Sequence, residues 1–380
     1  MMMIKGGQPQ SPLKNDMLIN SHSMDISQYQ KIDHTLFHIT KKLKVLGYTE
    51  ALNSQKQKRM FLQDRIENPR FIYKKAQYDT QKIGELLNRL KPPNDDIGKL
   101  QQEIIHELHI RNNIIRYIGK AAMIKKLTIK LFCKPSQKLI RNARRILFKE
   151  KHNLKYHSES KELTSKDMIS HFKSYLINQK LDHWQVTMSR QHSVSIASTQ
   201  RRIKISPFKR YSESDKKRLE VHEIQGHVFR TENGYNQPLK MFAVGLPKYL
   251  STEEGITTIL EEKKGLRTAP LKVRYSLRVI AVHTACSGKS FRDCFNMLKI
   301  YDIDDHEAWE ITYRAYRGGG FVKDHIYLKG YMDMKSYLKK GGNLVDLYIG
   351  KIGFHHRELC NVLQKDKILS RPQYLPNLHD

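Results

Sequence analysis

The chain has 380 residues, of which 39% are hydrophobic and 28% charged, so it can bury a sizeable core. Lysine and arginine number 68 against 38 acidic residues, and the resulting net charge of +30 favours acidic partners. The four cysteines are scattered without a C-x-x-C pair, which excludes a disulfide framework and a cysteine zinc site. No apolar run approaches the roughly 20 residues of a membrane span, and the first residues lack the apolar segment of a signal peptide. We therefore expect a soluble, cytoplasmic protein.

The first part of the chain predicts helices. Residues 1–28 are polar and lack periodicity, so we expect a flexible tail there. From 29 to 160, apolar residues recur at three- and four-residue spacings, which predicts a helical N-terminal region. Pro92-Pro93 separates two of these helices, and Pro135-Ser136 opens another at 134–148.

The character of the sequence changes near Trp184. Alternating polarity and β-forming residues predict short strands at about 184–206. Ser212, with Asp215 three residues later, is a helix-start signal. Apolar spacing predicts further helices at about 252–264, 272–286, 290–301, 305–317 and 325–339, interrupted by glycines at 318–320 and 341–342. The expected fold class is α+β and predominantly helical.

The stretch HEIQGH, residues 222–227, comes close to the H-E-x-x-H signature of zinc metallopeptidases. Histidines four apart lie about 40° apart around a regular helix, whereas histidines five apart lie about 140° apart. A π-bulge would absorb one residue and bring His222 and His227 to the same side, and Gly226 is a suitable place for the helix to loosen. The spacing therefore predicts a helix that is bulged or broken between Glu223 and His227. The alternative is an ordinary pair of helix histidines beside a surface glutamate.

Two histidines on a catalytic zinc ion require a third protein ligand and leave a position open for water. Glu223 would then be the general base that takes a proton from this water. Glu253 and Glu254, in the stretch LPKYLSTEEGITTILEEKK, are candidates for the third ligand. Ser251-x-x-Glu254 is also a capping box, which would use Glu254 to start the helix instead. Helical periodicity does not choose between the two glutamates.

Three stretches in order, HEIQGHVFRTENGYNQP, GLPKYLSTEEGI and AYRGGGFVKDHIYLKGY, resemble the microtubule-associated tyrosine carboxypeptidases and related bacterial proteins named for a Gln-Glu-Gly-Leu-Ala motif. The family pattern is H-E-I-G-T-H, an N-G-x-x-Q-P turn, T-[EQ]-E-G-L-A and R-G-G-x-x-T-K-D-x-x-Y-L. The resemblance covers roughly residues 30–360. It departs from the pattern at Gln225-Gly226, which stands where the family has Gly-Thr.

Carried over residue by residue, the resemblance implies one zinc ion per chain. Its ligands would be His222, His227 and Glu254, and Glu223 would be the catalytic base. The resemblance favours Glu254 over Glu253 because the first acidic position is glutamine in the bacterial signature.

A carboxypeptidase also needs a cation for the terminal carboxylate and a donor for the developing oxyanion. The segment RGGGFVKDHIYLKGY offers Arg317 and Lys323 for the carboxylate and Tyr327 for the oxyanion. Arg230, one turn beyond His227, is another candidate cation. Each of these side chains has an ordinary structural or surface role as its alternative.

The resemblance implies a zincin-like metallopeptidase core with short edge strands, in a catalytic region at 161–364 followed by a C-terminal tail at 365–380. The expected reaction is zinc-assisted removal of a C-terminal residue from a peptide or protein tail. In animal members of the family this residue is the terminal tyrosine of α-tubulin, and an acidic tail suits the net charge of +30.

Two other classes of function compete with this one. The first is a basic module that binds acidic proteins or nucleic acid and holds a structural metal or none. Of these partners, nucleic acid is the less favoured. The second is a zinc hydrolase of a non-peptide amide. A closed site of four protein ligands would indicate a structural metal, and three ligands would indicate catalysis. His106 and His109, three positions apart on a charged amphipathic helix, have the spacing of a metal-binding pair, but a solvated helix face is the preferred interpretation. His355 and His356 have no matching carboxylate pattern and predict no site.

Overall fold

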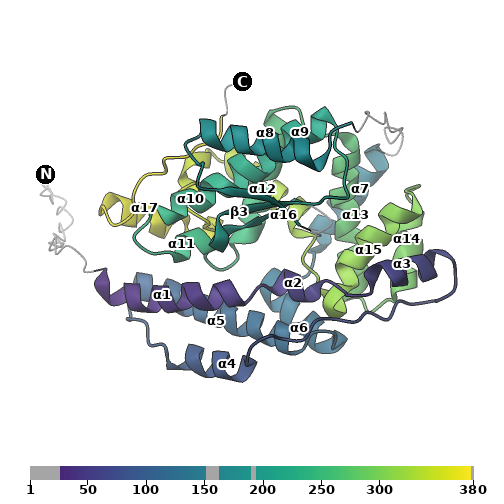
Figure 1. Cartoon of the computed structure of the whole chain (residues 1–380), viewed down its shortest axis with the longest axis horizontal. Coiled ribbons are helices and arrows are strands. Elements are labelled where there is room, and N and C mark those ends of the chain that lie inside the picture. The colour runs from purple at the N-terminus through teal and green to yellow at the C-terminus, as the bar shows by residue number, and fades with distance from the viewer. Residues whose placement is uncertain (1–25, 151–161, 190–193, 378–380) are drawn as a thin grey trace, which may run out of the picture.

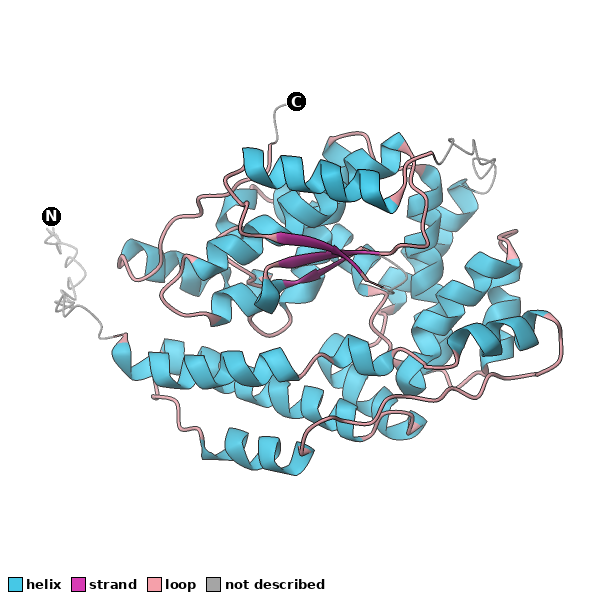
Figure 2. Cartoon of the chain, viewed as in Figure 1, coloured by secondary structure: helices cyan, strands magenta, loops and turns pink. Residues whose placement is uncertain are grey.

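The computed structural model describes residues 26–150, 162–189 and 194–377 of the chain. Helices dominate these residues, and a small three-stranded sheet lies among them (Figures 1 and 2), which confirms the predicted α+β, mainly helical class. In the described part of the chain, no helix is both long enough and apolar enough to cross a bilayer.

Helices α1, α2, α4, α5 and α6 of the N-terminal region form the lower layer in Figure 1, with the long helix α5 running beside α1, whereas α7 lies beside α13. The first helix begins at Ser27, and the predicted tail before residue 26 lies outside the described residues. Pro92-Pro93 lies between α4 and α5, as predicted. The helices of this region are α1 (Ser27–Lys42), α2 (Val45–Thr49), α3 (Ser54–Leu62), α4 (Thr80–Arg89), α5 (Asp96–Arg116), α6 (Ala121–Phe132) and α7 (Gln137–Glu150).

The predicted strands are present as β1 (Gln185–Met188), β2 (Ser195–Ala197) and β3 (Arg202–Ile205). Their order is β1-β3-β2, with β1 parallel and β2 antiparallel to β3. Helix α8 (Ser165–Asn178) packs on β1 and β3. The sheet is short because each strand has only three or four residues.

The second half of the chain supplies the remaining helices at nearly the predicted positions. They are α9 (Glu213–Leu219), a π-helix (Glu220–Val228), α10 (Phe229–Tyr235), α11 (Met241–Val244), α12 (Tyr249–Lys263), α13 (Ala269–Cys286), α14 (Phe291–Lys299), α15 (Asp305–Gly320), α16 (Ile326–Lys339) and α17 (Arg357–Lys365). The predicted interruption at glycines 318–320 is real, because all three have positive φ and α15 loses helical geometry at Arg317.

The larger of two hydrophobic clusters runs through both halves of the chain, from Tyr29 in α1 to Leu369 near the C-terminus, and the smaller lies between α5 and α6. Helix α7, at the end of the predicted N-terminal region, packs on α13 and α16 of the predicted catalytic region. The two regions are therefore joined through a common interior.

Helices α12 and α16 cross very closely, and this contact fixes the position of the third motif relative to the second. A Cβ atom on Gly255 would lie 2.3 Å from the carbonyl oxygen of Gly330, and one on Gly330 would lie 2.0 Å from that of Ser251. Only glycine allows two backbones to approach this closely.

The residues after α17 were predicted as a polar tail, but those that the structure describes pack against α10. The Asn233 side-chain amide donates to the carbonyl of Tyr374, and its Oδ1 accepts from the backbone of Gln373 and Tyr374. Gln237 bonds in the same way to both backbone groups of Ser370. These two amides, which follow the HEIQGH motif in the sequence, anchor the C-terminal segment.

Candidate metal centre

The helix that carries HEIQGH begins at the predicted capping box. Ser212 accepts from the backbone N–H of Asp215, and the Asp215 side chain accepts from that of Ser212. The helix then becomes a π-helix over Glu220–Val228, where the backbone N–H of Phe229 donates to the carbonyl of Ile224, five residues earlier. The predicted distortion is thus present, and it spans nine residues rather than a single bulge.

Gly226 lets this π-helix lie directly against α12. A Cβ atom at position 226 would lie 2.3 Å from Cγ2 of Thr257, well inside van der Waals contact. The hydroxyl of Thr257 donates to the carbonyl of Glu254 at 2.9 Å, so the threonine is held in place by its own helix. The glycine predicted to loosen the helix therefore also sets the distance between the two elements of the site.

We expect Gly226→Ala to lower the free energy of unfolding by about 1–3 kcal/mol, the usual cost of overpacking a core. The added methyl group must displace either Thr257 or the π-helix. Combining Gly226→Ala with Thr257→Ser, which removes Cγ2 and keeps the hydroxyl, should restore most of the loss. Urea unfolding of both variants and of Thr257→Ser alone provides the measurement. A double variant no more stable than Gly226→Ala would contradict this account of the glycine.

The π-helix brings the predicted ligands together. His222, His227 and Glu254 each offer a ligand atom, and these atoms all lie within 4.8 Å of one another. The two imidazole centroids are 5.1 Å apart, and Nε2 of His222 lies 3.6 Å from Oε2 of Glu254. All three side chains are nearly buried.

Two features of the structure distinguish the two candidate glutamates. Helix α12 begins at Tyr249 after Lys248, so the capping box at Ser251 does not form and Glu254 lies inside the helix. Oε2 of Glu254 is buried without a hydrogen-bond partner among the described residues. Such an atom is expensive unless a further partner occupies the site. Two imidazoles and this carboxylate suit a zinc ion with one position left open.

Buried carboxylates fix the outer edge of each imidazole. Oε1 of Glu261 lies 3.0 Å from Nδ1 of His222, and Oε2 of Glu253 lies 3.1 Å from Nδ1 of His227. Metal-binding histidines are typically oriented in this way, because the carboxylate fixes the tautomer and leaves Nε2 for the metal. Glu253, the other candidate ligand, thus orients His227. Glu261, which orients His222, was not predicted from the sequence. It lies two turns after Glu254 on α12, which is the signal that could have revealed it.

A further ring of cations neutralises these carboxylates. Lys351 and Arg230 each lie 3.3 Å from Oε1 of Glu253, and Arg218 lies 3.1 Å from Oε1 of Glu261. Burial raises the pKa of Glu253, but Lys351, His227 and Arg230 outweigh it and lower that pKa to about 2. The carboxylate therefore stays ionised at neutral pH.

The same balance holds at the ligands themselves. Burial lowers the pKa of His222, but the carboxylates of Glu254 and Glu261 raise it to about 10. Burial raises the pKa of Glu254, yet His222 and Lys323 bring it down to about 2. The carboxylates thus draw positive charge into this space, and a metal ion would take the place of the His222 proton.

Arg230 and Arg317, two of the predicted substrate cations, have protein partners in this structure. Arg230 is fully buried and donates to the carbonyls of Leu347 and Ile352 as well as to Glu253. Arg317 pairs with Glu50 of the N-terminal layer. Arg230 thus lies behind His227 and supports Glu253.

Glu223, Lys323 and Tyr327 lie close to the ligands. Glu223 is 7% exposed and has no hydrogen-bond or ion-pair partner among the described residues. Nζ of Lys323 lies 3.9 Å from Oε1 of Glu254 and 5.2 Å from the ring centroid of Tyr327. The Tyr327 ring stacks on Tyr275, and its hydroxyl has no protein partner in the described part of the chain. Burial raises the pKa of Tyr327 well above its usual value, so it remains a hydrogen-bond donor.

Arg278 of α13 is a cation that sequence reasoning missed. Its guanidinium lies 4.7 Å from the ring centroid of Tyr327 and 5.4 Å from that of Tyr275. Its Nε is buried without a hydrogen-bond partner among the described residues. The nearby charge of Asp324 acts on it, but Asp324 pairs with Arg314. The neighbours of Arg278 in sequence give no hint of this position, because α13 reads as an ordinary core helix.

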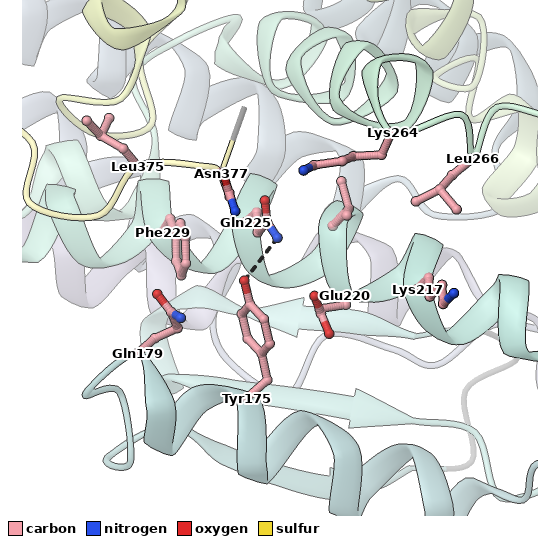
Figure 3. Close-up of a pocket in the computed structure, with 11 residues that line it drawn as sticks. Tyr175, Gln179, Lys217, Glu220, Gln225, Phe229, Lys264, Leu266, Leu375 and Asn377 are labelled. Atoms are coloured by element: carbon pink, nitrogen blue, oxygen red, sulfur yellow. Dashed lines mark hydrogen bonds between the residues drawn. The ribbon is translucent and has the colours of Figure 1, made fainter. Parts of the chain in front are cut away.

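A separate pocket lies on another face of the motif helix (Figure 3). Its lining includes Tyr175 of α8, Gln179 directly after α8, Glu220 and Gln225 of the π-helix, and Lys264. Gln225 donates to the hydroxyl of Tyr175 at 2.9 Å. None of the predicted ligands lines this pocket. The departure from the family pattern at Gln225 therefore lies away from the metal centre.

Known proteins of one family are similar to this chain. The family model for microtubule-associated tyrosine carboxypeptidase matches residues 58–380. Microtubule-associated tyrosine carboxypeptidase 1 of Rattus norvegicus is 28% identical over 171 residues, which cover 41% of this chain and 35% of that protein. The Mus musculus and Homo sapiens proteins of the same name are each 33% identical over 120 residues, covering 29% of this chain and 25% of theirs. These alignments span about a quarter to a third of the relatives' length. Because the family model covers most of the chain, the chain belongs to the microtubule-associated tyrosine carboxypeptidase family.

Proposed function

We propose that this chain is a zinc-dependent metallocarboxypeptidase with a zincin-like core, which removes the C-terminal residue of an acidic protein tail. The observation that carries the proposal is the pair of histidines, each backed by a buried carboxylate, around the unpartnered oxygen of Glu254. The group holds three ligands from the described residues, which favours a catalytic metal over a closed structural one.

His222, His227 and Glu254 would hold the ion. A bound zinc ion would supply Lewis acidity, lowering the pKa of a water molecule and polarising the scissile carbonyl. Glu223, which has no protein partner among the described residues, takes the proton from the attacking water and passes it to the leaving amine. Tyr327 donates its hydroxyl proton in a hydrogen bond to the oxyanion. Lys323 adds positive charge at the same place.

Arg278 fits the remaining requirement, a cation for the terminal carboxylate. A guanidinium whose Nε has no hydrogen-bond partner among the described residues, lying against two tyrosine rings, is prepared to bind a carboxylate beside an aromatic side chain. The relatives are named as tyrosine carboxypeptidases associated with microtubules. A tyrosine that follows acidic residues is therefore the first substrate to test, and the net charge of +30 would steer such a tail to the enzyme.

The proposal is tested by incubating the purified chain with peptides of varied C-terminal sequence and identifying the products by mass spectrometry. We expect loss of one residue from the C-terminus, fastest for tyrosine after acidic residues, and no cleavage of the same peptides with a C-terminal amide. Cleavage within the peptide would refute the carboxypeptidase assignment while keeping a peptidase. No cleavage of any peptide by zinc-loaded protein would refute both.

We expect Arg278→Gln to weaken substrate and product binding. Losing a buried charged hydrogen bond costs about 2–5 kcal/mol, which corresponds to a fall in kcat/KM of about 30- to 4,000-fold. Inhibition by free tyrosine should weaken in parallel, whereas inhibition by tyramine, which lacks the carboxylate, should not. Arg317→Gln is the matched control, because Glu50 already binds that arginine. An Arg317→Gln defect larger than that of Arg278→Gln would reverse the assignment.

A further inference from the structure

His355 and His356, which predicted no site from the sequence, meet a carboxylate in the fold. They belong to the short 3₁₀ turn Phe354–His356, and Glu103 comes from the middle of α5 in the N-terminal layer. The three side chains each offer a ligand atom, and these atoms all lie within 4.8 Å of one another. Glu103 and His356 are 253 positions apart, so spacing in the sequence carries no trace of the cluster.

The geometry of this cluster resembles that of a metal site. Nε2 of His356 lies 3.3 Å from Oε2 of Glu103. The edge of a tetrahedron with metal–ligand bonds of about 2.0–2.1 Å is also about 3.3 Å. The centroids of the two imidazoles are 3.9 Å apart, so His355 can reach the same ion.

The surroundings hold these side chains in place. His356 is 3% exposed, and its Nδ1 is buried without a hydrogen-bond partner among the described residues. The ring of His355 lies against Gly353, where a Cβ atom would come within 2.8 Å of its Cε1. On the next turn of α5, Glu107 is already paired with Arg111, whereas Glu103 pairs with His356 alone in the described part of the chain.

We propose that Glu103, His355 and His356 form a second metal site, for zinc or a similar first-row divalent ion, that fastens α5 to the segment before α17. Two imidazoles and one carboxylate are the ligand set that such ions prefer. The site is independent of the proposed catalysis, and it raises the expected metal content from one ion per chain to two.

This site lies at one end of a segment that supports the catalytic ligands. The segment begins at the 3₁₀ turn Leu344–Leu347 and ends at His356. Along it, Leu347 and Ile352 accept hydrogen bonds from Arg230, and Lys351 pairs with Glu253, the carboxylate behind His227. An ion at the second site would hold the far end of this segment against α5, so the ion would stabilise the fold.

The test uses the full chain with the catalytic ligands removed by His222→Ala and Glu254→Ala. After treatment with a chelator and equilibrium dialysis against buffered zinc, mass spectrometry of the metal should find one zinc ion per chain. Adding His355→Ala or Glu103→Gln, both at exposed positions, should remove that ion and abolish the rise in Tm that zinc produces.

His34→Ala is the matched control, because the exposed His34 and His38 lie with ring centroids 4.3 Å apart outside any such group of ligands in the described residues. Its zinc content should equal that of the parent variant. Absence of zinc from the parent variant would overturn the second site. Zinc that persists in both His355→Ala and Glu103→Gln, or that falls equally in His34→Ala, would show nonspecific binding and overturn it as well.

Discussion

Glu223→Gln should keep its zinc and lose hydrolysis, with kcat reduced by at least about 100- to 10,000-fold, the range that general-base catalysis supplies. Glutamine has nearly the same shape as glutamate but cannot take a proton from the attacking water. Because Glu223 has no protein partner among the described residues, the change breaks no hydrogen bond or ion pair of the fold. A loss of activity in this variant is therefore due to the lost proton transfer and not to a disturbed fold.

The measurement is the rate of release of the C-terminal residue, together with zinc content and thermal stability of the same preparation. Glu220→Gln is the matched control, because Glu220 lies on the same π-helix and pairs with His171 at 2.7 Å, beside the pocket of Figure 3. Its activity should be close to that of the unchanged chain. A Glu223→Gln enzyme that retains most of its rate would remove Glu223 from the mechanism.

The second large effect is expected when a metal ligand is removed. The loss of zinc affinity should be much larger for a ligand than for a residue that only supports a ligand. His222→Ala and Glu254→Ala should each lose the zinc ion of the catalytic site and with it the activity, because the two remaining ligands hold that ion weakly. Glu253→Gln should lower zinc affinity by only about 10- to 100-fold, the usual effect of changing a group behind a ligand. Glu253 contacts Nδ1 of His227 and not the centre of the site.

Zinc affinity is measured by competition with a chromophoric chelator, and circular dichroism verifies that each variant is folded. The comparison of Glu253 with Glu254 is the most informative, because the two residues are adjacent in the chain and are assigned different roles. Full retention of zinc in both His222→Ala and Glu254→Ala would refute the ligand set. A greater loss in Glu253→Gln than in Glu254→Ala would exchange their roles.

Local rules of the sequence were enough to predict the motif helix. The capping box at Ser212 and Asp215 depends only on neighbouring residues, and it forms as predicted. The five-residue spacing of His222 and His227 is incompatible with one metal on a regular helix, so the spacing itself required a distortion. The π-helix satisfies that requirement.

What surrounds the ligands could not be predicted, because it depends on how distant elements pack. Lys351 and Arg218 reach the supporting carboxylates from segments on either side of α12 in the chain. Arg230 and Arg317 looked like free cations only because their partners, backbone carbonyls and Glu50, are far away in the sequence. Arg278 was overlooked for the opposite reason. Nothing near it in the sequence shows that its Nε lacks a hydrogen-bond partner among the described residues.

The π-helix also determines the rotational phase of the chain beyond it. After Val228 the helix returns to α geometry, and there Arg230 faces Leu347 and Ile352 while Asn233 faces Tyr374. If the same residues formed a regular α-helix, His227 and everything after it would be rotated by about 100° relative to His222. The arginine and the asparagine would then turn away from their partners. The π-helix thus keeps both the second histidine and the segment that follows it in register with the first histidine.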